Sequence, residues 1–152
     1  MIIDILDGEF RGDNDILLTR YRGYNQEKRR YEGFLIFGHP ILAKELTKQR
    51  LIAGDGIHQV APPPFQQLYI IGFFANHVRG GIKFFPCVYI LMTNKTQFLY
   101  EKLFGWLASQ GDDSYLKWVT YISDFEFGAI NAVINNVPRD RPNLENLEPH
   151  GI

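Results

Sequence analysis

Hydrophobic and polar positions divide the chain into three zones. Residues 1–33 are polar and charged and lack sustained periodicity, which predicts a loosely structured N-terminal polar arm with a short strand near Ile16 to Leu18. Residues 34–138 hold dense apolar segments separated by turn residues, which predicts a folded core. From Pro138 onward the chain carries three prolines and no apolar periodicity. This predicts an extended tail over 139–152, without a buried strand or a long helix.

Within the core, the pattern predicts an α/β domain. Pro40 suits the first turn of a helix, and Thr96 is a good N-cap for a second one. The predicted elements are a strand over 34–37, a helix over 40–49, a short apolar strand over 51–53, strands over 65–74 and 82–92, a helix over 97–110, a strand over 118–122 and a helix over 126–136. After the strand-helix lead-in, the order is strand-strand-strand-helix-strand-helix, which predicts a mixed sheet with a hairpin and a crossover helix.

Pro86 interrupts the predicted strand over 82–92. A proline has no N–H to donate to a neighbouring strand, so it is tolerated at a sheet edge or at a bulge. The sequence therefore predicts that this strand is an edge strand or is bulged at Pro86.

Composition and charge narrow the class of protein. With 45% hydrophobic and 22% charged residues the chain has the composition of a globular protein. Its net charge of −1 argues against a free-standing nucleic-acid-binding domain, which is usually basic. The basic run Lys28-Arg29-Arg30 is either a solvated surface turn or a patch for phosphate contact or nuclear import.

The expected compartment follows from cysteine usage and apolar patterning. Cys87 is the single cysteine, so no internal disulfide or cysteine-rich zinc cluster can form, and a reducing, intracellular environment is expected. Asp4 and Asp7 follow the first residues closely, which is unlike a signal peptide. The longest apolar stretch, 82–92, is too short to span a bilayer, so no membrane partner is expected.

Two aspartates are the candidate chemical groups. Asp55 follows the first central strand, and Asp124 follows the strand after the crossover helix. If those strands lie side by side, both carboxylates reach one edge of the sheet, where hard oxygen ligands suit Mg²⁺ or Mn²⁺. Such ions activate a water or a DNA 3′ hydroxyl for attack on a phosphodiester. The alternative is that both are turn or cap residues, and that Glu126 occupies the first turn of a helix because the helix dipole favours it there.

Several segments, in the same order, resemble the catalytic core of Mutator-like element transposases. Asp55-Gly56 and the run 60–69 (VAPPPFQQLY) resemble the family's D-G-T-F and F-x-Q-L-Y motifs. Residues 85–96 (FPCVYILMTNKT) are similar to P-L-V-Y-A-L-L-x-N-K-T. The segment 123–132 (SDFEFGAINA) resembles T-D-F-E followed by A-I-N-A. The lead-in 35–38 also has a counterpart upstream of the family's first aspartate.

The resemblance implies an RNase H-like fold and descent from a DDE transposase that cleaves and joins DNA. It implies that Asp55 and Asp124 are the first two metal ligands, that Mg²⁺ or Mn²⁺ is the cofactor, that transposon-end DNA is the partner and that the location is nuclear. Ile57-His58 replaces the family's Thr-Phe, so His58 is either a chance substitution or an added metal or phosphate contact. The family's third ligand, a glutamate, has no counterpart after Val137, and neither Glu145 nor Glu148 is assigned to it.

Three functional readings follow from this partial match. The chain is a fragment of a strand-transferring transposase core, an inactive domesticated or decayed binding module, or an RNase H-like nuclease whose third acid is Glu126 or Asp113. The sheet is predicted to lack its final strand. The exposed edge of the strand over 118–122 is then expected to be covered by the N-terminal segment or by dimerisation. A homodimer or a missing C-terminal segment is accordingly a candidate partner.

Overall fold

The computed structural model describes residues 16–123, 126–138 and 149–150. Within these residues the chain folds as one mixed α/β domain, which confirms the predicted class. The elements are β1 (Leu17–Asn25), β2 (Arg30–Gly38), α2 (Pro40–Lys48), β3 (Leu51–Ile57), β4 (Gln67–Asn76), β5 (Ile82–Met92), α3 (Gln97–Ser109), β6 (Thr120–Ile122), α4 (Phe127–Asn135) and β7 (Pro149–His150). No helix among them is long and apolar enough to cross a bilayer.

All of these strands belong to one sheet, in the order β1-β2-β5-β4-β3-β6-β7. Each neighbouring pair from β1 to β3 is antiparallel, whereas β6 runs parallel to β3 and β7 runs parallel to β6. A parallel neighbour requires a long crossover, and α3 lies in the connection that brings the chain back to β6. The predicted crossover helix is therefore confirmed.

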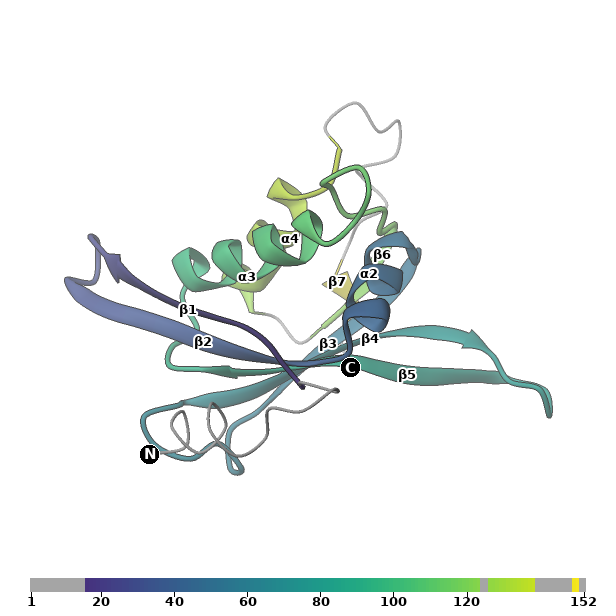
Figure 1. Cartoon of the computed structure of the whole chain (residues 1–152), viewed down its shortest axis with the longest axis horizontal. Helices are drawn as coiled ribbons and strands as arrows, with labels where there is room; N and C mark the ends of the chain where they lie inside the picture. Colours follow the sequence, from purple (N-terminus) through teal and green to yellow (C-terminus); the bar gives the residue numbers. More distant parts are fainter. Residues whose placement is uncertain (1–15, 124–125, 139–148, 151–152) are drawn as a thin grey trace.

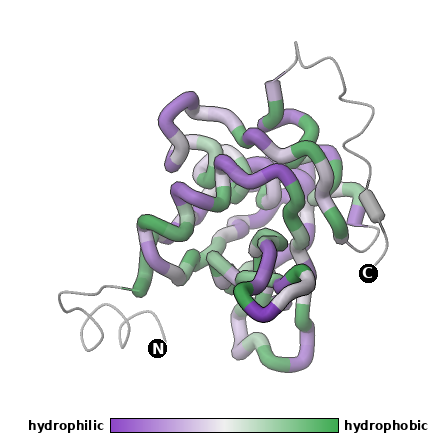
Figure 2. The backbone as a smooth tube through the Cα atoms, turned by 90° about the vertical axis from the view of Figure 1, so that its right-hand side faces the viewer, coloured by the Kyte–Doolittle hydropathy of each residue, from purple (hydrophilic) through white to green (hydrophobic). Residues whose placement is uncertain are grey.

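The helices cover one face of the sheet (Figure 1). Apolar side chains from this face and from the helices form a single buried cluster, which includes Ile36, Ile52, Val88, Leu103 and Val133. Hydrophobic and hydrophilic residues intermix along the chain in Figure 2, and the central part of β2 is buried on both faces. The opposite face of the sheet is more exposed and carries the candidate site described below.

Aromatic packing ties the crossover region to the rest of the core. The ring of Phe104 in α3 meets Trp118 and Tyr121 edge to face, at centroid distances of 5.7 and 6.0 Å. The indole Nε1 of Trp118 donates to the backbone oxygen of Leu46 in α2, at 2.8 Å. Edge-to-face aromatic pairs stabilise by about 0.5–1.5 kcal/mol beyond the area they bury. One buried tryptophan thus links α2, α3 and the segment leading into β6.

Most element boundaries fall close to their predicted positions, and the main error is at the N-terminal side. The predicted short strand near residues 16–18 is the start of β1. The predicted loose arm was wrong for residues 19–33, because β1 and β2 form an antiparallel hairpin in which the tilted rings of Tyr21 and Phe34 lie with their centroids 5.4 Å apart. Arg20, Arg22 and Gly23 interrupt the apolar alternation of β1. This strand is therefore specified by its pairing with β2 and not by a pattern of its own.

The predicted irregularity at Pro86 is confirmed as a bulge. In the β4–β5 ladder, Ile71 pairs with Val88 and Gly72 pairs with Pro86, so Cys87 is the extra residue. The pairing of β2 with β5 ends at Val88, so Pro86 also lies beyond the last residue that β2 covers. Its missing N–H therefore leaves no neighbour without a partner.

The far edge of the sheet differs from the prediction. The short strand β7 pairs with β6 through Tyr121↔Pro149 and Ile122↔His150, so a final strand is present and comes from the tail. The predicted covering by the N-terminal segment was wrong for residues 16–25, because β1 lies at the opposite edge of the sheet. A two-residue strand that contains a proline has no recognisable pattern in the sequence, which explains the error.

Candidate functional site

Asp55 lies within β3, not after it as predicted, and its side chain is exposed. The glycines on either side of it face the helices. A Cβ at Gly54 would collide with the hydroxyls of Tyr69 and Tyr121, and one at Gly56 would collide with the Gln67 amide. Because side chains alternate along a strand, Asp55 points to the opposite face. The Gly-Asp-Gly run therefore reflects close packing beneath a strand, and the alternative reading as a turn was wrong for Asp55.

A pocket of about 280 Å³ surrounds Asp55 on this open face. Its walls are almost entirely apolar and come from β3, β4, β5 and β6: Ala53, Gly54, Asp55, Ile57, Ile70, Phe74, Phe84 and Ile122. Asp55 is the one ionisable group among these lining residues. A carboxylate with apolar walls on a rigid strand can hold a cation or accept hydrogen bonds in a defined direction.

The strand that precedes Asp124 lies beside the strand of Asp55, as predicted. The parallel β3–β6 register pairs Ile52 with Tyr121 and Ala53 with Ile122. Ile122 also lines the Asp55 pocket. Asp124 itself lies outside the described residues, so its role as a metal ligand stays a prediction.

A buried network of polar side chains lies beneath β3, on the helix-covered face. Gln67 Nε2 donates to the Tyr100 hydroxyl at 2.7 Å, and Tyr100 in turn donates to Glu126. Beside it, the hydroxyls of Tyr69 and Tyr121 share a hydrogen bond. Gln67 Oε1 has no partner among the described residues and lies under Gly56. This network connects β4, α3, β6 and the residue that caps α4.

Burial sets the protonation of these tyrosines. It raises the pKa of Tyr69 well above its usual range, with Tyr121 and Tyr100 adding to the shift. Burial and the hydrogen bond to Glu126 raise the pKa of Tyr100 as well. Both hydroxyls therefore remain protonated, and Tyr100 donates to Glu126.

Glu126 is placed differently from the prediction. It is the N-cap residue of α4 and not a member of its first turn, and its side chain makes no capping hydrogen bond. The carboxylate instead accepts from Tyr100 and lies 3.8 Å from Lys95 Nζ. Tyr100 in α3 and Lys95 just before α3, rather than the dipole of α4, determine where the Glu126 carboxylate points.

His58 and Glu126, the two auxiliary candidates, share Lys95 as a neighbour. His58 Nε2 is 3.3 Å from Lys95 Nζ on the exposed surface. An ammonium group so close to both side chains opposes the binding of a second cation between them. The Lys95 ammonium therefore disfavours a metal ion held by both side chains, and the Glu126 carboxylate likewise disfavours an anion between them.

Asp113, the other candidate for a third acid, lies far along the strand from Asp55. Its carboxylate forms an ion pair with Lys117 at 3.0 Å, and Lys117 N–H donates to Thr47 beside the start of β3. Asp55 is near the other end of that strand. Within the part of the chain that the structure describes, no three His, Cys, Asp or Glu side chains lie close enough together to hold a metal ion.

Sequence reasoning missed Lys95 and the role of the Gln67–Tyr100 pair. The sequence showed that Gln67 and Tyr69 alternate along a predicted strand and so share one face, and the structure shows that this face of β4 is buried. Lys95 had no such signal, because its position beside His58 and Glu126 depends on how the loop after β5 meets the ends of β3 and α4. Comparison of the chain with protein-family models, curated proteins and solved structures found no match.

Proposed function

We propose that this chain is part of an RNase H-like catalytic core of the Mutator-like DDE transposase type. In this proposal Asp55 and Asp124 bind Mg²⁺ or Mn²⁺, and the ancestral activity is cleavage and strand transfer of DNA at transposon ends. A nuclear location belongs to the same proposal. Its basis is the ordered series of motif resemblances around the two aspartates, together with the topology of the sheet.

The topology supports the proposal through its strand directions. Three antiparallel strands, β3, β4 and β5, are followed by α3 and by β6, which returns parallel to β3 at its free side. The strand β7 then extends the sheet by one more parallel strand, as an RNase H-like sheet does. The N-terminal hairpin lies at the other edge, beside β5, and leaves this arrangement intact.

The single observation that carries the proposal is the parallel pairing of β3 with β6. It places the strand that holds Asp55 next to the strand that leads to Asp124, although 69 positions separate the two aspartates in the chain, from 55 to 124. No local feature of either segment requires β3 and β6 to be neighbours in the sheet. Two carboxylates on adjacent strands would hold the divalent ions, which supply Lewis-acid activation of an attacking oxygen and stabilisation of a leaving one.

The protein's own contribution is to position Asp55. Backbone pairing on both sides of β3 fixes the strand, and the tight contacts at Gly54 and Gly56 fix its height above the tyrosine network. The pocket walls are apolar, so Asp55 is the one charged side chain among its lining residues, and this side chain is exposed to solvent. A ligand held in this way loses little conformational freedom when it binds a cation.

Nicking of supercoiled plasmid in the presence of Mn²⁺ tests the proposal. Asp55→Asn and Asp124→Asn should each abolish nicking, because each removes a carboxylate ligand without changing side-chain size. Asp113→Asn is the matched control, since it makes the same change at an exposed ion pair near the other end of β3. Equal nicking by the wild type and both site variants would refute the assignment, and joining of a transposon end to target DNA separates a transposase from a simple nuclease.

An inactive binding module is the second candidate, and one observation favours it. The described residues do not assemble a third acidic ligand near Asp55, and removing one member of a cooperating ligand set usually removes most activity. If the folded protein fails to nick DNA in the presence of Mg²⁺ and also in the presence of Mn²⁺, the result would support a binding module and not an enzyme.

A further inference from the structure

The β1–β2 hairpin is basic and aromatic, unlike the chain as a whole. Residues 20–32 contain five cationic and two acidic side chains, although the net charge of the whole chain is −1. Tyr24 and Tyr31 are 41% and 58% exposed and pack edge to face, with ring centroids 5.2 Å apart. The guanidinium of Arg22 lies over the Tyr31 ring, at 4.1 Å from its centroid. Exposed aromatic rings beside arginines are the usual components of a surface that binds single-stranded nucleic acid.

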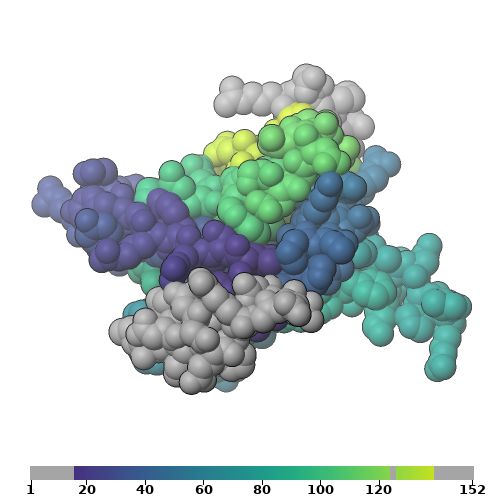
Figure 3. All heavy atoms as spheres, in the orientation of Figure 1, coloured from purple at the N-terminus to yellow at the C-terminus, as the bar shows by residue number. Residues whose placement is uncertain are grey.

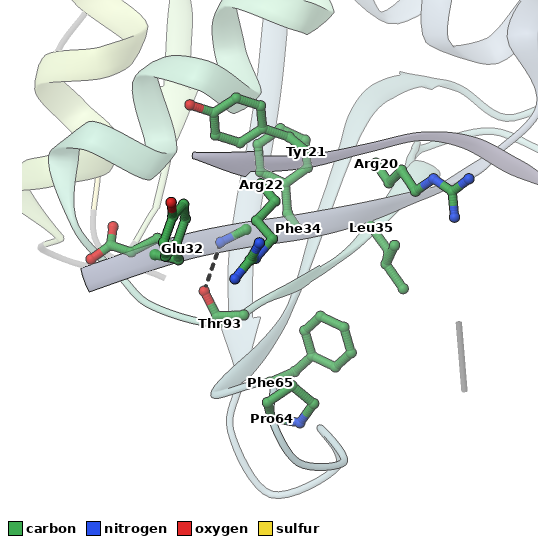
Figure 4. A pocket seen from close by; sticks show the side chains of 11 residues that line it. Arg20, Tyr21, Arg22, Glu32, Phe34, Leu35, Pro64, Phe65 and Thr93 are labelled. Carbon is green, nitrogen blue, oxygen red and sulfur yellow. Dashed lines mark hydrogen bonds between the residues drawn. The ribbon is translucent and has the colours of Figure 1, made fainter. Parts of the chain in front are cut away.

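A pocket of about 380 Å³ opens at the base of this hairpin. One wall comes from β1 and β2 and includes Arg20, Arg22 and Leu35, and the other comes from Pro64 and Phe65 in the loop before β4. Figure 4 shows Arg22 and Leu35 extending from their strands toward the Pro64–Phe65 segment. The floor is apolar and the rim is cationic, which is the combination that accommodates a flat aromatic group carrying a negative charge.

The acidic residue at this pocket does not oppose an anion. Glu32 is almost fully buried, forms an ion pair with Arg30 at 2.9 Å and accepts from the Thr96 hydroxyl. In Figure 4 its carboxylate points away from Phe65. Thr93 Oγ1 accepts from the Gly33 N–H at 2.9 Å and marks the polar end of the pocket. The contact with an anion is therefore assigned to Arg22.

We propose that this pocket and the adjoining hairpin bind single-stranded nucleic acid. One unpaired base enters the apolar space beside Phe65, neighbouring bases stack on the Tyr24–Tyr31 pair, and Arg22 contacts the backbone phosphate. A base inside a duplex cannot reach such a pocket, because its faces are covered by stacking. The proposal requires neither Asp55 nor a metal ion, so it stands or fails separately from the proposed catalytic function.

Fluorescence anisotropy with a labelled oligothymidylate, in the presence of a metal chelator, tests the proposal. An oligonucleotide of the same length with abasic sites has the same phosphates but no bases, and it should bind at least about tenfold more weakly, since it loses the stacking of bases on aromatic rings. Tyr31→Ala should weaken binding of the oligothymidylate by a similar factor. A blunt duplex of the same sequence should bind more weakly than the single strand.

Variants of Arg22 test the phosphate contact. Arg22→Gln should weaken binding and reduce the slope of log K against log salt by about 0.7, the value expected for one phosphate contact on a single strand. Arg22→Lys should keep the slope and lose part of the affinity, because lysine keeps the charge but not the planar group that stacks on Tyr31. Arg79→Gln is the matched control: Figure 3 shows the β4–β5 hairpin, whose turn carries Arg79, projecting on the opposite side of the molecule from the β1–β2 hairpin. It should bind like the wild type.

Three results would overturn the proposal. Equal affinity for the abasic and normal strands would show that no base enters the pocket. Competition by an acidic peptide as effective as competition by the oligonucleotide would show that only charge is recognised. Equal loss of affinity in Arg79→Gln and Arg22→Gln would show that binding depends on net charge and not on the hairpin.

Discussion

Tyr100 is the residue at which the polar groups beneath the candidate site meet. It accepts from Gln67, donates to Glu126 and lies edge to face with Tyr69, at a centroid distance of 5.4 Å. Glu126 comes two positions after Asp124 in the chain. The hydroxyl of one buried tyrosine therefore connects β4, the neighbour of the strand that holds Asp55, to the segment that contains the second aspartate.

The raised pKa values of the buried tyrosines predict a loss of stability in alkaline solution. Tyr69 and Tyr100 resist ionisation in the folded protein but ionise near pH 10 when unfolded, so their contribution is complete below pH 10 and is lost as the pH rises further. Burial also raises the pKa of the Cys87 thiol from 9.0 to about 11, so the loss of folding stability begins near pH 9. Urea unfolding above pH 10 should give a free energy of unfolding that falls by about 1.4 kcal/mol per pH unit for each tyrosine.

Two variants separate this linkage from a general loss of packing. Tyr100→Phe should make the alkaline slope shallower by about 1.4 kcal/mol per pH unit, because one titrating group is removed. Leu103→Ala removes buried packing without removing a titrating group, so it should lower stability and keep the wild-type slope. An unchanged slope in Tyr100→Phe would contradict the assignment of the buried hydroxyl.

At the scale of elements, the start of α3 is tied to the sheet through Thr96. Its hydroxyl accepts from the Leu99 N–H at 3.3 Å and also donates to the buried carboxylate of Glu32 in β2. One side chain thus caps the helix and satisfies an acid in the neighbouring strand. The N-cap was predictable from the sequence, whereas the contact with Glu32 joins two residues that are 64 positions apart in the chain.

Loss of this cap should destabilise the protein measurably. Thr96→Ala should lower the free energy of unfolding by about 1–2 kcal/mol, since the helix loses its cap and the Glu32 carboxylate loses a donor. Thr96→Ser retains the hydroxyl and should remain close to the wild type in urea unfolding. If Thr96→Ala were as stable as Thr96→Ser, the cap and the Glu32 contact would contribute nothing.

At the scale of the whole molecule, the β6 edge depends on the tail. The strand β7 pairs with Tyr121 and Ile122, so part of the edge beside the candidate site is covered from within the chain. Deletion of residues 139–152 should expose that edge and cause self-association that increases with protein concentration, because unpaired edges recruit other strands. Light scattering coupled to size exclusion measures this directly.

A charged edge residue provides the control for the deletion. Thr120→Lys in the shortened chain should restore the monomer, since an edge lysine opposes strand pairing between molecules. A shortened chain that stays monomeric at every concentration would show that β7 does not protect the sheet.

The sequence by itself determined the local elements whose signals are strong. Proline at the start of α2, threonine at the cap of α3 and the apolar run of β5 all act on neighbouring residues, so their helices and strands fall close to their predicted bounds. The resemblance around Asp55 and Asp124 is likewise a property of the sequence alone. It names the candidate ligands without placing them.

Only the tertiary structure decided the features that depend on distant partners. The strand β1 exists because β2 pairs with it, and Asp55 faces the open side because tyrosine hydroxyls fill the space beneath its flanking glycines. Glu126 points toward Tyr100 and Lys95 because these two residues supply its hydrogen-bond donor and its nearby cation. Each of these arrangements joins segments far apart in the chain, and no local pattern of hydrophobic and polar residues records which distant segment will supply the partner.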